Sequence, residues 1–428
     1  MQVIPYPHLN ETLYAEKLPN GLNVYVLPKE GFQKTYATFS TNYGSVDNHF
    51  QVEGGPEVRV PDGIAHFLEH KMFEEPEGDV FANFASQGAS ANAFTSFDRT
   101  AYLFSATENM LTNLETLLNF VQNPYFTDEN VEKEKGIIGQ EIKMYQDQPD
   151  WRSYFGLIEA MYQKHPVHID IAGTVESISK ITKETLYSCY HTFYHPSNMN
   201  LFVVGGVNPE EIFEFVKKNQ AAKAFGPQGE IKRFFEEEPV RVDTPQKVTA
   251  LTVSLPKCLF GLKERAPGVD GRPLLEKELA TKLVLDILFS ASSSIYQSLY
   301  DDNLISDNFG LEYNCSSDYA FSVIGGDTRD PMQLVERVKQ EVEKRKGSGL
   351  DAETFERSRK KKIGNFLRML NSPESIANEF TKYQFKGIDL FDILPVYEGM
   401  TLERINERFR EHFNWEQLAV SIVQSEPV

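Results

Sequence analysis

Two histidines and a glutamate lie close together in the segment His66-Phe67-Leu68-Glu69-His70. On an α-helix, His66 and His70 are one turn apart and Glu69 is three residues from His66, so the three side chains project from neighbouring positions. Two imidazoles at this spacing can chelate one zinc ion, and Glu69 is then placed to act on the attacking water as a general base. The segment therefore predicts a metal-dependent hydrolytic centre.

The alternative interpretation is a charged surface helix that carries two histidines by chance. With 9 histidines among 428 residues, a chance H-x-x-E-H is expected on the order of once in a hundred chains. The preceding residues 62–65 provide a capping aspartate and an apolar entry, which are typical of a helix start. We therefore predict that His66 and His70 bind a metal ion.

A catalytic zinc ion normally takes three ligands from the protein, so a third must come from elsewhere in the chain. Glu141 is the candidate, because it lies in a segment with helical periodicity at 128–145. In such a helix Glu134 and Glu141 lie two turns apart on one face, so both carboxylates point toward the same neighbour. The alternative for either glutamate is an ordinary exposed position on a charged helix.

The first half of the chain mixes strand and helix patterns around the histidine segment. Residues 20–45 predict a β-hairpin, with alternating apolar residues at 22–27 and a second strand at 34–40. The remaining elements expected in this half are strands at 91–96, 100–105 and 200–206 and helices at 109–121 and 128–145.

The second half repeats this order of elements, which indicates two copies of one α+β domain. When the copies are aligned through Val131 and Phe355, the second has Ser358 and Asn365 in place of the two glutamates of the 128–145 helix. The copy without the histidines thus also lacks both carboxylates, which favours a shared site in the first copy. The repeated elements are a helix at 291–299, strands at 309–313 and 319–324, and helices at 332–346 and from 352 onward.

A Gly/Pro-rich, charged stretch separates the copies and is typical of a linker. We place a zinc-bearing domain at 1–222, the linker at 223–246 and a homologous domain without the zinc motif at 247–428. The predicted fold class is α+β, with an antiparallel-rich sheet flanked by helices in each domain. A length of 428 residues agrees with two domains, because it exceeds what one hydrophobic core usually organises.

Composition excludes several classes of protein. The net charge of −19 argues against nucleic-acid binding, which needs a basic face. The 3 cysteines contain no C-x-x-C pair, so we expect neither a disulfide framework nor a thiolate metal site. There is no basic-then-apolar leader pattern and no run of about 18 apolar residues. We therefore expect a cytoplasmic protein without a membrane segment.

Four segments make the chain resemble the pitrilysin, insulinase and mitochondrial processing peptidase family of zinc peptidases, over essentially its whole length. These segments are 63–70, 88–96, 134–141 and 194–201. The resemblance implies half of a clam-shell, built from two homologous domains. It also implies an enzyme with one zinc ion per chain that hydrolyses internal bonds of short or unfolded peptides.

The resemblance assigns roles to the residues of the metal centre. It implies that Glu141 is the third zinc ligand beside His66 and His70, in agreement with the choice made from periodicity. It implies a supporting role for Glu134, which we interpret as a carboxylate that orients a ligand histidine.

A strand edge is the second feature that the resemblance implies. Asn92, Ala93 and Phe94 would lie on a strand to which the substrate adds as a further strand, so that the backbone is recognised more than the side chains. The alternative for Phe94 is ordinary core packing.

One departure from the family pattern concerns the second copy. Family members usually carry a segment like L-R-x-x-x-x-L-A-Y there, whose arginine and tyrosine contact the substrate. The corresponding residues 299–307 have Tyr300 in place of the arginine and Asp307 in place of the tyrosine. We therefore expect a homologous zinc-less subunit to supply the pair, with a homodimer as the alternative. The alternative function is a non-catalytic structural or peptide-binding subunit, against which Glu69 and the intact ligand set argue.

Overall fold

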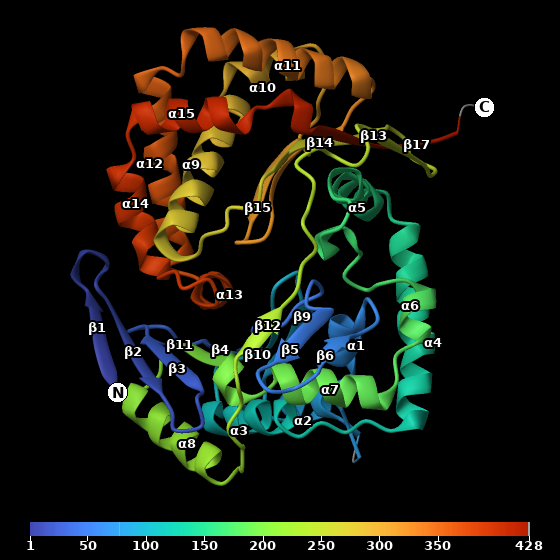
Figure 1. The fold of residues 1–428 in the computed structure, drawn as a ribbon. Coiled ribbons are helices and arrows are strands. Elements are labelled where there is room, and N and C mark those ends of the chain that lie inside the picture. Colours follow the sequence, from blue (N-terminus) through green and yellow to red (C-terminus); the bar gives the residue numbers. More distant parts are fainter. Residues whose placement is uncertain (77, 427–428) are drawn as a thin grey trace. The chain divides into compact units, whose positions relative to one another are not determined.

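The computed structural model describes residues 1–76 and 78–426. The chain forms two compact units, each an α+β body with one main sheet and its own helices (Figure 1). The chain passes from the first to the second at residues 235–236, within the stretch predicted as a linker, and it also changes unit inside the α4 helix. Unit 1 comprises Met1–Ile142, Ile169–Phe235 and Met369–Phe385, and unit 2 comprises Lys143–His168, Glu236–Arg368 and Lys386–Val428.

Unit 1 is built on a seven-stranded sheet in the order β1-β2-β3-β11-β4-β10-β9. Neighbouring strands are antiparallel, except for β3 and β11, which are parallel. Every residue of β4 and β11 is buried, because α3 and α8 cover one face of the sheet and α13 the other (Figure 1). The strands are β1 Gln2–Tyr6, β2 Glu11–Lys17, β3 Asn23–Pro28, β4 Thr35–Thr41, β9 Ser90–Thr95, β10 Thr100–Ala106 and β11 Met199–Gly205.

The hairpin predicted at residues 20–45 is wrong in its pairing. Both strands exist as β3 and β4, but β11 lies between them, and its Leu201 pairs with Val24 on one side and Phe39 on the other. The apolar β11 strand takes the centre of the sheet, since only there are both of its faces covered. The other strands and helices predicted in this half are confirmed to within two residues.

The helices of unit 1 pack around this sheet. A small sheet of three short strands and a hairpin with two strands of two residues each complete the unit. The α4 helix continues for four residues into unit 2. The helices are α1 Ile64–Lys71, α2 Val80–Ser86, α3 Met110–Val121, α4 Asp128–Gln146, α6 Val175–Ser179, α7 Lys183–Phe193, α8 Pro209–Ala221 and α13 Pro373–Gln384. The small strands are β5 His49–Val52, β6 Glu57–Arg59 and β12 Ile231–Arg233 in one sheet and β7 Glu74–Glu75 and β8 Gly78–Asp79 in the hairpin.

Unit 2 repeats the sheet of unit 1, which confirms the predicted duplication. Its order β13-β17-β14-β16-β15 matches β3-β11-β4-β10-β9, including the parallel pair at the same place. The α5 helix, which follows α4, packs on this sheet, whereas α13, which follows α12, packs on the sheet of unit 1. The elements are β13 Gln246–Ala250, β14 Lys257–Glu264, β15 Gly310–Cys315, β16 Ala320–Asp327, β17 Leu418–Gln424, α5 Pro149–Met161, α9 Gly271–Phe289, α10 Ser294–Asp301, α11 Pro331–Ser348, α12 Ala352–Met369, α14 Ile393–Gly399 and α15 Leu402–His412.

The α9 helix forms the centre of unit 2. It packs against β15, α10, α14 and α15, and most of its side chains from Leu274 onward are buried. Among the described residues, no single helix is both long and apolar enough to span a membrane, although α9 and α10, bent by 43°, meet the criteria of length and composition jointly.

His165 in unit 2 links stability to pH. Its ring is buried, and its Nδ1 accepts a hydrogen bond from the Val167 backbone N–H at 3.2 Å. Burial lowers the pKa of His165 from 6.5 to about 4. On acidification, the imidazole of His165 binds a proton in the unfolded chain at a higher pH than in the folded chain. The part of the folding stability that depends on neutral His165 is therefore fully present above pH 6.5 and is lost as the pH falls toward 4.

We expect His165→Asn to remove this part of the acid sensitivity, because the amide oxygen replaces the Nδ1 acceptor but does not titrate. On acidification, the free energy of unfolding of the wild type should fall by about 3 kcal/mol more than that of the variant. Denaturant unfolding of both proteins at neutral pH and near pH 4 measures the difference. Equal pH dependence in the two proteins would contradict the assignment.

Candidate metal centre

The α1 helix, which carries both histidines, is embedded in the core of unit 1. Its Phe67 and Leu68 are fully buried and anchor it from the side opposite the site. Gly63 precedes the helix with a φ of 85°, and a Cβ there would lie 2.4 Å from the carbonyl oxygen of Ala172. The start of the helix therefore requires glycine, both for the backbone conformation and for the close approach of residue 172.

The structure brings His66 and His70 together with Glu141 of α4. The two imidazole rings have centroids 4.6 Å apart. Glu141 Oε2 lies 3.8 Å from His66 Nε2 and 3.5 Å from His70 Nε2. One ligand atom from each of the three residues thus falls within 4.8 Å of the others, and no second such group occurs in the described part of the chain.

These three side chains fit a divalent metal ion of the zinc type. Two imidazole nitrogens and one carboxylate oxygen form a common ligand set for catalytic zinc, which leaves a further coordination position open. Burial, together with the neighbouring His70, lowers the pKa of His66 to about 3. His66 is therefore neutral at physiological pH and keeps a lone pair for a metal.

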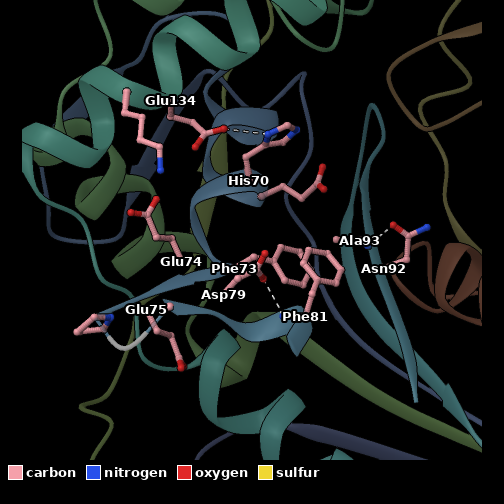
Figure 2. A pocket seen from close by; sticks show the side chains of 13 residues that line it. His70, Phe73, Glu74, Glu75, Asp79, Phe81, Asn92, Ala93 and Glu134 are labelled. Atoms are coloured by element: carbon pink, nitrogen blue, oxygen red, sulfur yellow. Dashed lines mark hydrogen bonds and ion pairs between the residues drawn. The ribbon is translucent and has the colours of Figure 1, made fainter. Parts of the chain in front are cut away.

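Glu134 connects α4 to α1 through His70 and Lys71. Its Oε1 lies 3.1 Å from His70 Nδ1 (Figure 2), and its Oε2 lies 3.7 Å from Lys71 Nζ. Burial alone would raise the pKa of Glu134, but the hydrogen bond and charge of His70, with the charge of Lys71, bring that pKa below its usual value. An ionised Glu134 holds the proton on His70 Nδ1, which directs Nε2 toward Glu141.

Lys71 was not singled out by the sequence. It is fully buried although it is charged, and it also pairs with Glu74 at the end of the helix. A lysine next to a motif histidine is not informative in itself, because its partner Glu134 is 63 residues away in the sequence. Its role depends on how α4 packs against α1.

Glu69 lies beside the three ligand atoms and is not one of them. It is 9% exposed, and its Oε2 accepts a hydrogen bond of 2.9 Å from the Thr95 hydroxyl. Burial raises the pKa of Glu69, although the charge of His70 and the bond from Thr95 oppose this shift. Thr95 lies within the segment 88–96, but the sequence alone did not indicate a role for it. It orients one carboxylate oxygen and leaves the other available.

The β9 strand forms one edge of the seven-stranded sheet. Its inner side pairs with β10, and in the described residues no strand pairs with its outer side. The Ala93 backbone N–H instead donates to Asn92 Oδ1 at 2.9 Å. Phe94 is half-buried, with the Arg99 guanidinium 5.3 Å from the centre of its ring. The roles of Asn92, Ala93 and Phe94 in substrate binding stay predictions.

The matching positions of unit 2 hold no ligand set. The α12 helix begins at a position equivalent to the start of α4 and places buried Ser358 and exposed Asn365 where α4 has its two glutamates. Tyr300, which is predicted to replace the family arginine, lies on α10 with 45% exposure.

Comparisons with known proteins find peptidases over essentially the whole length of the chain. Residues 56–175 match the profile of the insulinase family (peptidase family M16), and residues 180–362 match the M16 inactive domain. The chain is 56% identical to the zinc protease YmfH of Bacillus subtilis (strain 168), over 97% of both proteins. It is 44% identical to an M16-like peptidase from Alicyclobacillus acidocaldarius, whose crystal structure superposes with a TM-score of 0.95 and covers 99% of this chain and 100% of that one. A protease from Helicobacter pylori, 21% identical, shares the fold with a TM-score of 0.84 over 96% of this chain and 99% of its own.

We expect Gly63→Ala to destabilise unit 1 and to weaken metal binding, because α1 would have to shift away from residue 172. Gly31→Ala is the matched control, since Gly31 has a similar φ of 80° but no neighbour within 4 Å of a Cβ. The control should cost about 1 kcal/mol for the left-handed backbone alone, and Gly63→Ala clearly more. Thermal unfolding and zinc titration of both variants test this. Equal effects would show that the close approach is unimportant.

We expect Glu134→Gln to weaken zinc binding about tenfold or more, because the neutral amide no longer holds the proton on His70 Nδ1 as firmly. Glu132→Gln on the same helix is the control, since Glu132 is 70% exposed and pairs with Lys135 of α4. Competition with a chromogenic chelator measures both affinities. Unchanged affinity in Glu134→Gln would rule out the orienting role.

Proposed function

The chain belongs to the M16 (insulinase) family of peptidases, and from this premise we propose that it is a zinc endopeptidase that cleaves internal bonds of short or unfolded peptides. The observation that carries the proposal is the convergence of His66, His70 and Glu141 within 4.8 Å, with buried Glu69 beside them. A non-catalytic subunit would have no use for a buried carboxylate next to the ligand set.

His66, His70 and Glu141 would hold one zinc ion per chain. A bound zinc ion supplies Lewis-acid polarisation of the peptide carbonyl and makes water acidic enough to lose a proton near neutral pH. Glu134 keeps the Nε2 atom of His70 free for binding by occupying the Nδ1 side of the ring.

Glu69 is the general base. The oxygen that does not accept from Thr95 takes the proton of the attacking water and then delivers it to the leaving amine. Burial raises the pKa of Glu69. It therefore stabilises the protonated carboxyl, which is the form that Glu69 takes between accepting the proton and delivering it. Thr95 is a positioning residue, since it acts on the reaction through Glu69.

The outer side of β9 is the proposed substrate site. An extended peptide would add there as a further strand, and its backbone would replace Asn92 Oδ1 as the acceptor for the Ala93 N–H. Thr95 lies on the same strand as Ala93, so the strand that orders the peptide also orients the base. Recognition through the backbone suits unfolded chains better than folded proteins.

We also propose that the active enzyme contains a second subunit. The resemblance implies that Tyr300 and Asp307 replace a substrate-contacting arginine and tyrosine of family members, so we infer that this chain does not supply that pair. A homologous zinc-less subunit would supply it, and a homodimer is the alternative arrangement.

We expect Glu69→Gln to keep stoichiometric zinc but to lower peptide hydrolysis by about a thousandfold, because only the proton acceptor is lost. Metal analysis and a fluorogenic peptide assay measure the two properties, with Glu132→Gln as the control. Full activity in Glu69→Gln would refute the assignment of the base.

Wild type, Glu69→Gln and Glu132→Gln are each assayed alone and mixed with any homologous zinc-less protein that is encoded nearby. Activity that requires both the wild type and the second protein supports the two-subunit enzyme. Activity of the wild type alone contradicts an obligatory heterodimer, and stoichiometric zinc without hydrolysis in any mixture contradicts the proposed function.

A further inference from the structure

The five-stranded sheet of unit 2 ends at β13, whose outer edge is open. β13 pairs with β17 on one side, and in the part of the chain that the structure describes no strand pairs with the other side (Figure 1). Unit 1 differs at the equivalent edge, because β2 pairs there with β3 and β1 pairs in turn with β2. The described chain thus extends one copy of the duplicated sheet by two strands and leaves the other copy without them.

The register between β13 and β17 decides which backbone groups of β13 face outward. The carbonyl oxygen of Pro245 accepts a hydrogen bond from the Val420 N–H, and the Leu251 N–H donates to the carbonyl oxygen of Gln424. In a parallel pair of strands, alternate residues bond to the same neighbour. The backbone groups of residues 245, 247, 249 and 251 therefore face β17, and those of residues 246, 248 and 250 face outward.

The side chains of β13 leave this edge accessible. Natural edge strands are often protected by a proline or by a charged side chain, and β1, the edge strand of unit 1, contains Pro5. Lys247, the charged residue of β13, lies instead against α5, where its ammonium group pairs with Glu159. Val248 points to the opposite face and is 51% exposed. The strand therefore presents outward backbone donors and acceptors together with an apolar side chain.

We propose that this edge binds a second copy of the same chain, by antiparallel pairing of the two β13 strands about a twofold axis at Val248. The antiparallel direction is the one that β2 adopts on β3 at the equivalent edge of unit 1. The axis places residue 248 opposite itself and residue 246 opposite residue 250. These are the residues whose backbone groups face outward, so the pairing forms about six hydrogen bonds between the chains.

The sequence of β13 is compatible with its own copy in this register. Val248 meets its counterpart, and Lys247 lies opposite Thr249, so no like charges are opposed across the interface. An axis at Val248 also pairs all five residues of both strands. A shift of the axis to Lys247 would place two ammonium groups opposite each other and would leave part of each strand unpaired. The edge is therefore self-complementary in one register.

The pairing goes beyond the proposed function and does not depend on it, because β13 contains none of the residues of the metal centre or of the β9 edge strand. A twofold contact uses the same edge of both chains, so association stops at two copies. The contact is short, with five residues from each chain. We therefore expect a reversible dimer with a dissociation constant on the order of 10 µM.

Sedimentation velocity of the full chain over a range of concentrations tests the pairing. We expect the wild type to pass from monomer to dimer as its concentration rises. Val248→Lys should weaken the dimer about tenfold or more, because the axis opposes the two new ammonium groups. Val269→Lys is the matched control, since Val269 is a 43% exposed valine of unit 2 outside β13, and this variant should dimerise like the wild type. The zinc-free and zinc-loaded proteins should behave alike, so an inactive peptidase would leave this test unaffected.

A mixture of two variants tests the register itself. Val248→Glu alone should also dimerise weakly, whereas an equimolar mixture of Val248→Lys and Val248→Glu should recover the dimer, because opposite charges then face each other across the axis. Such recovery also shows that both variants are folded. A wild type that stays monomeric at every concentration would overturn the proposal. A dimer that Val248→Lys leaves unchanged, or a mixture no more dimeric than its components, would place the contact elsewhere and overturn it as well.

Discussion

A single buried carboxylate, that of Glu134, joins the helix with the histidines to the helix with the third ligand. It contacts His70 and approaches Lys71, which are neighbours at the end of α1. A buried charge without partners would be strongly unfavourable, so α4 can pack here only if the Nδ1–H of His70 and the ammonium group of Lys71 face it. This requirement places Glu141, two turns further along α4, opposite the two Nε2 atoms.

Close packing around α1 fixes the positions of the metal ligands. The apolar side of the helix is fully buried, and Gly63 lets residue 172 approach its start. Thr95 then ties Glu69 to the β9 strand, so the ligand histidines, the base and the sheet edge share one framework. A metal centre built on regular elements in this way needs little rearrangement to hold its ligands.

Duplication gave the protein two similar sheets with different tasks. The same five-strand order occurs in both units, including the parallel pair. In unit 2 the ligand positions of α4 are replaced by Ser358 and Asn365, and buried charge is instead concentrated where Glu264 pairs with Arg408 and His412. The fold thus tolerates loss of the metal centre, because the sheet and its covering helices supply the stability of each unit.

The sequence by itself determined the elements whose causes are local. The one-turn spacing of His66 and His70 and the two-turn spacing of Glu134 and Glu141 follow from helical geometry, and the internal comparison with α12 singled out both glutamates. Most strands and helices were also recovered, since periodicity and capping act over a few residues.

Only the tertiary structure decided which distant elements meet. Insertion of β11 between β3 and β4 depends on pairing across more than 150 residues, which no local pattern encodes. The roles of Lys71 and Thr95 depend likewise on contacts between elements far apart in the chain. Helical spacing brings ligands onto one face of a helix, but the packing of helix against helix and of helix against strand makes those faces converge on one site.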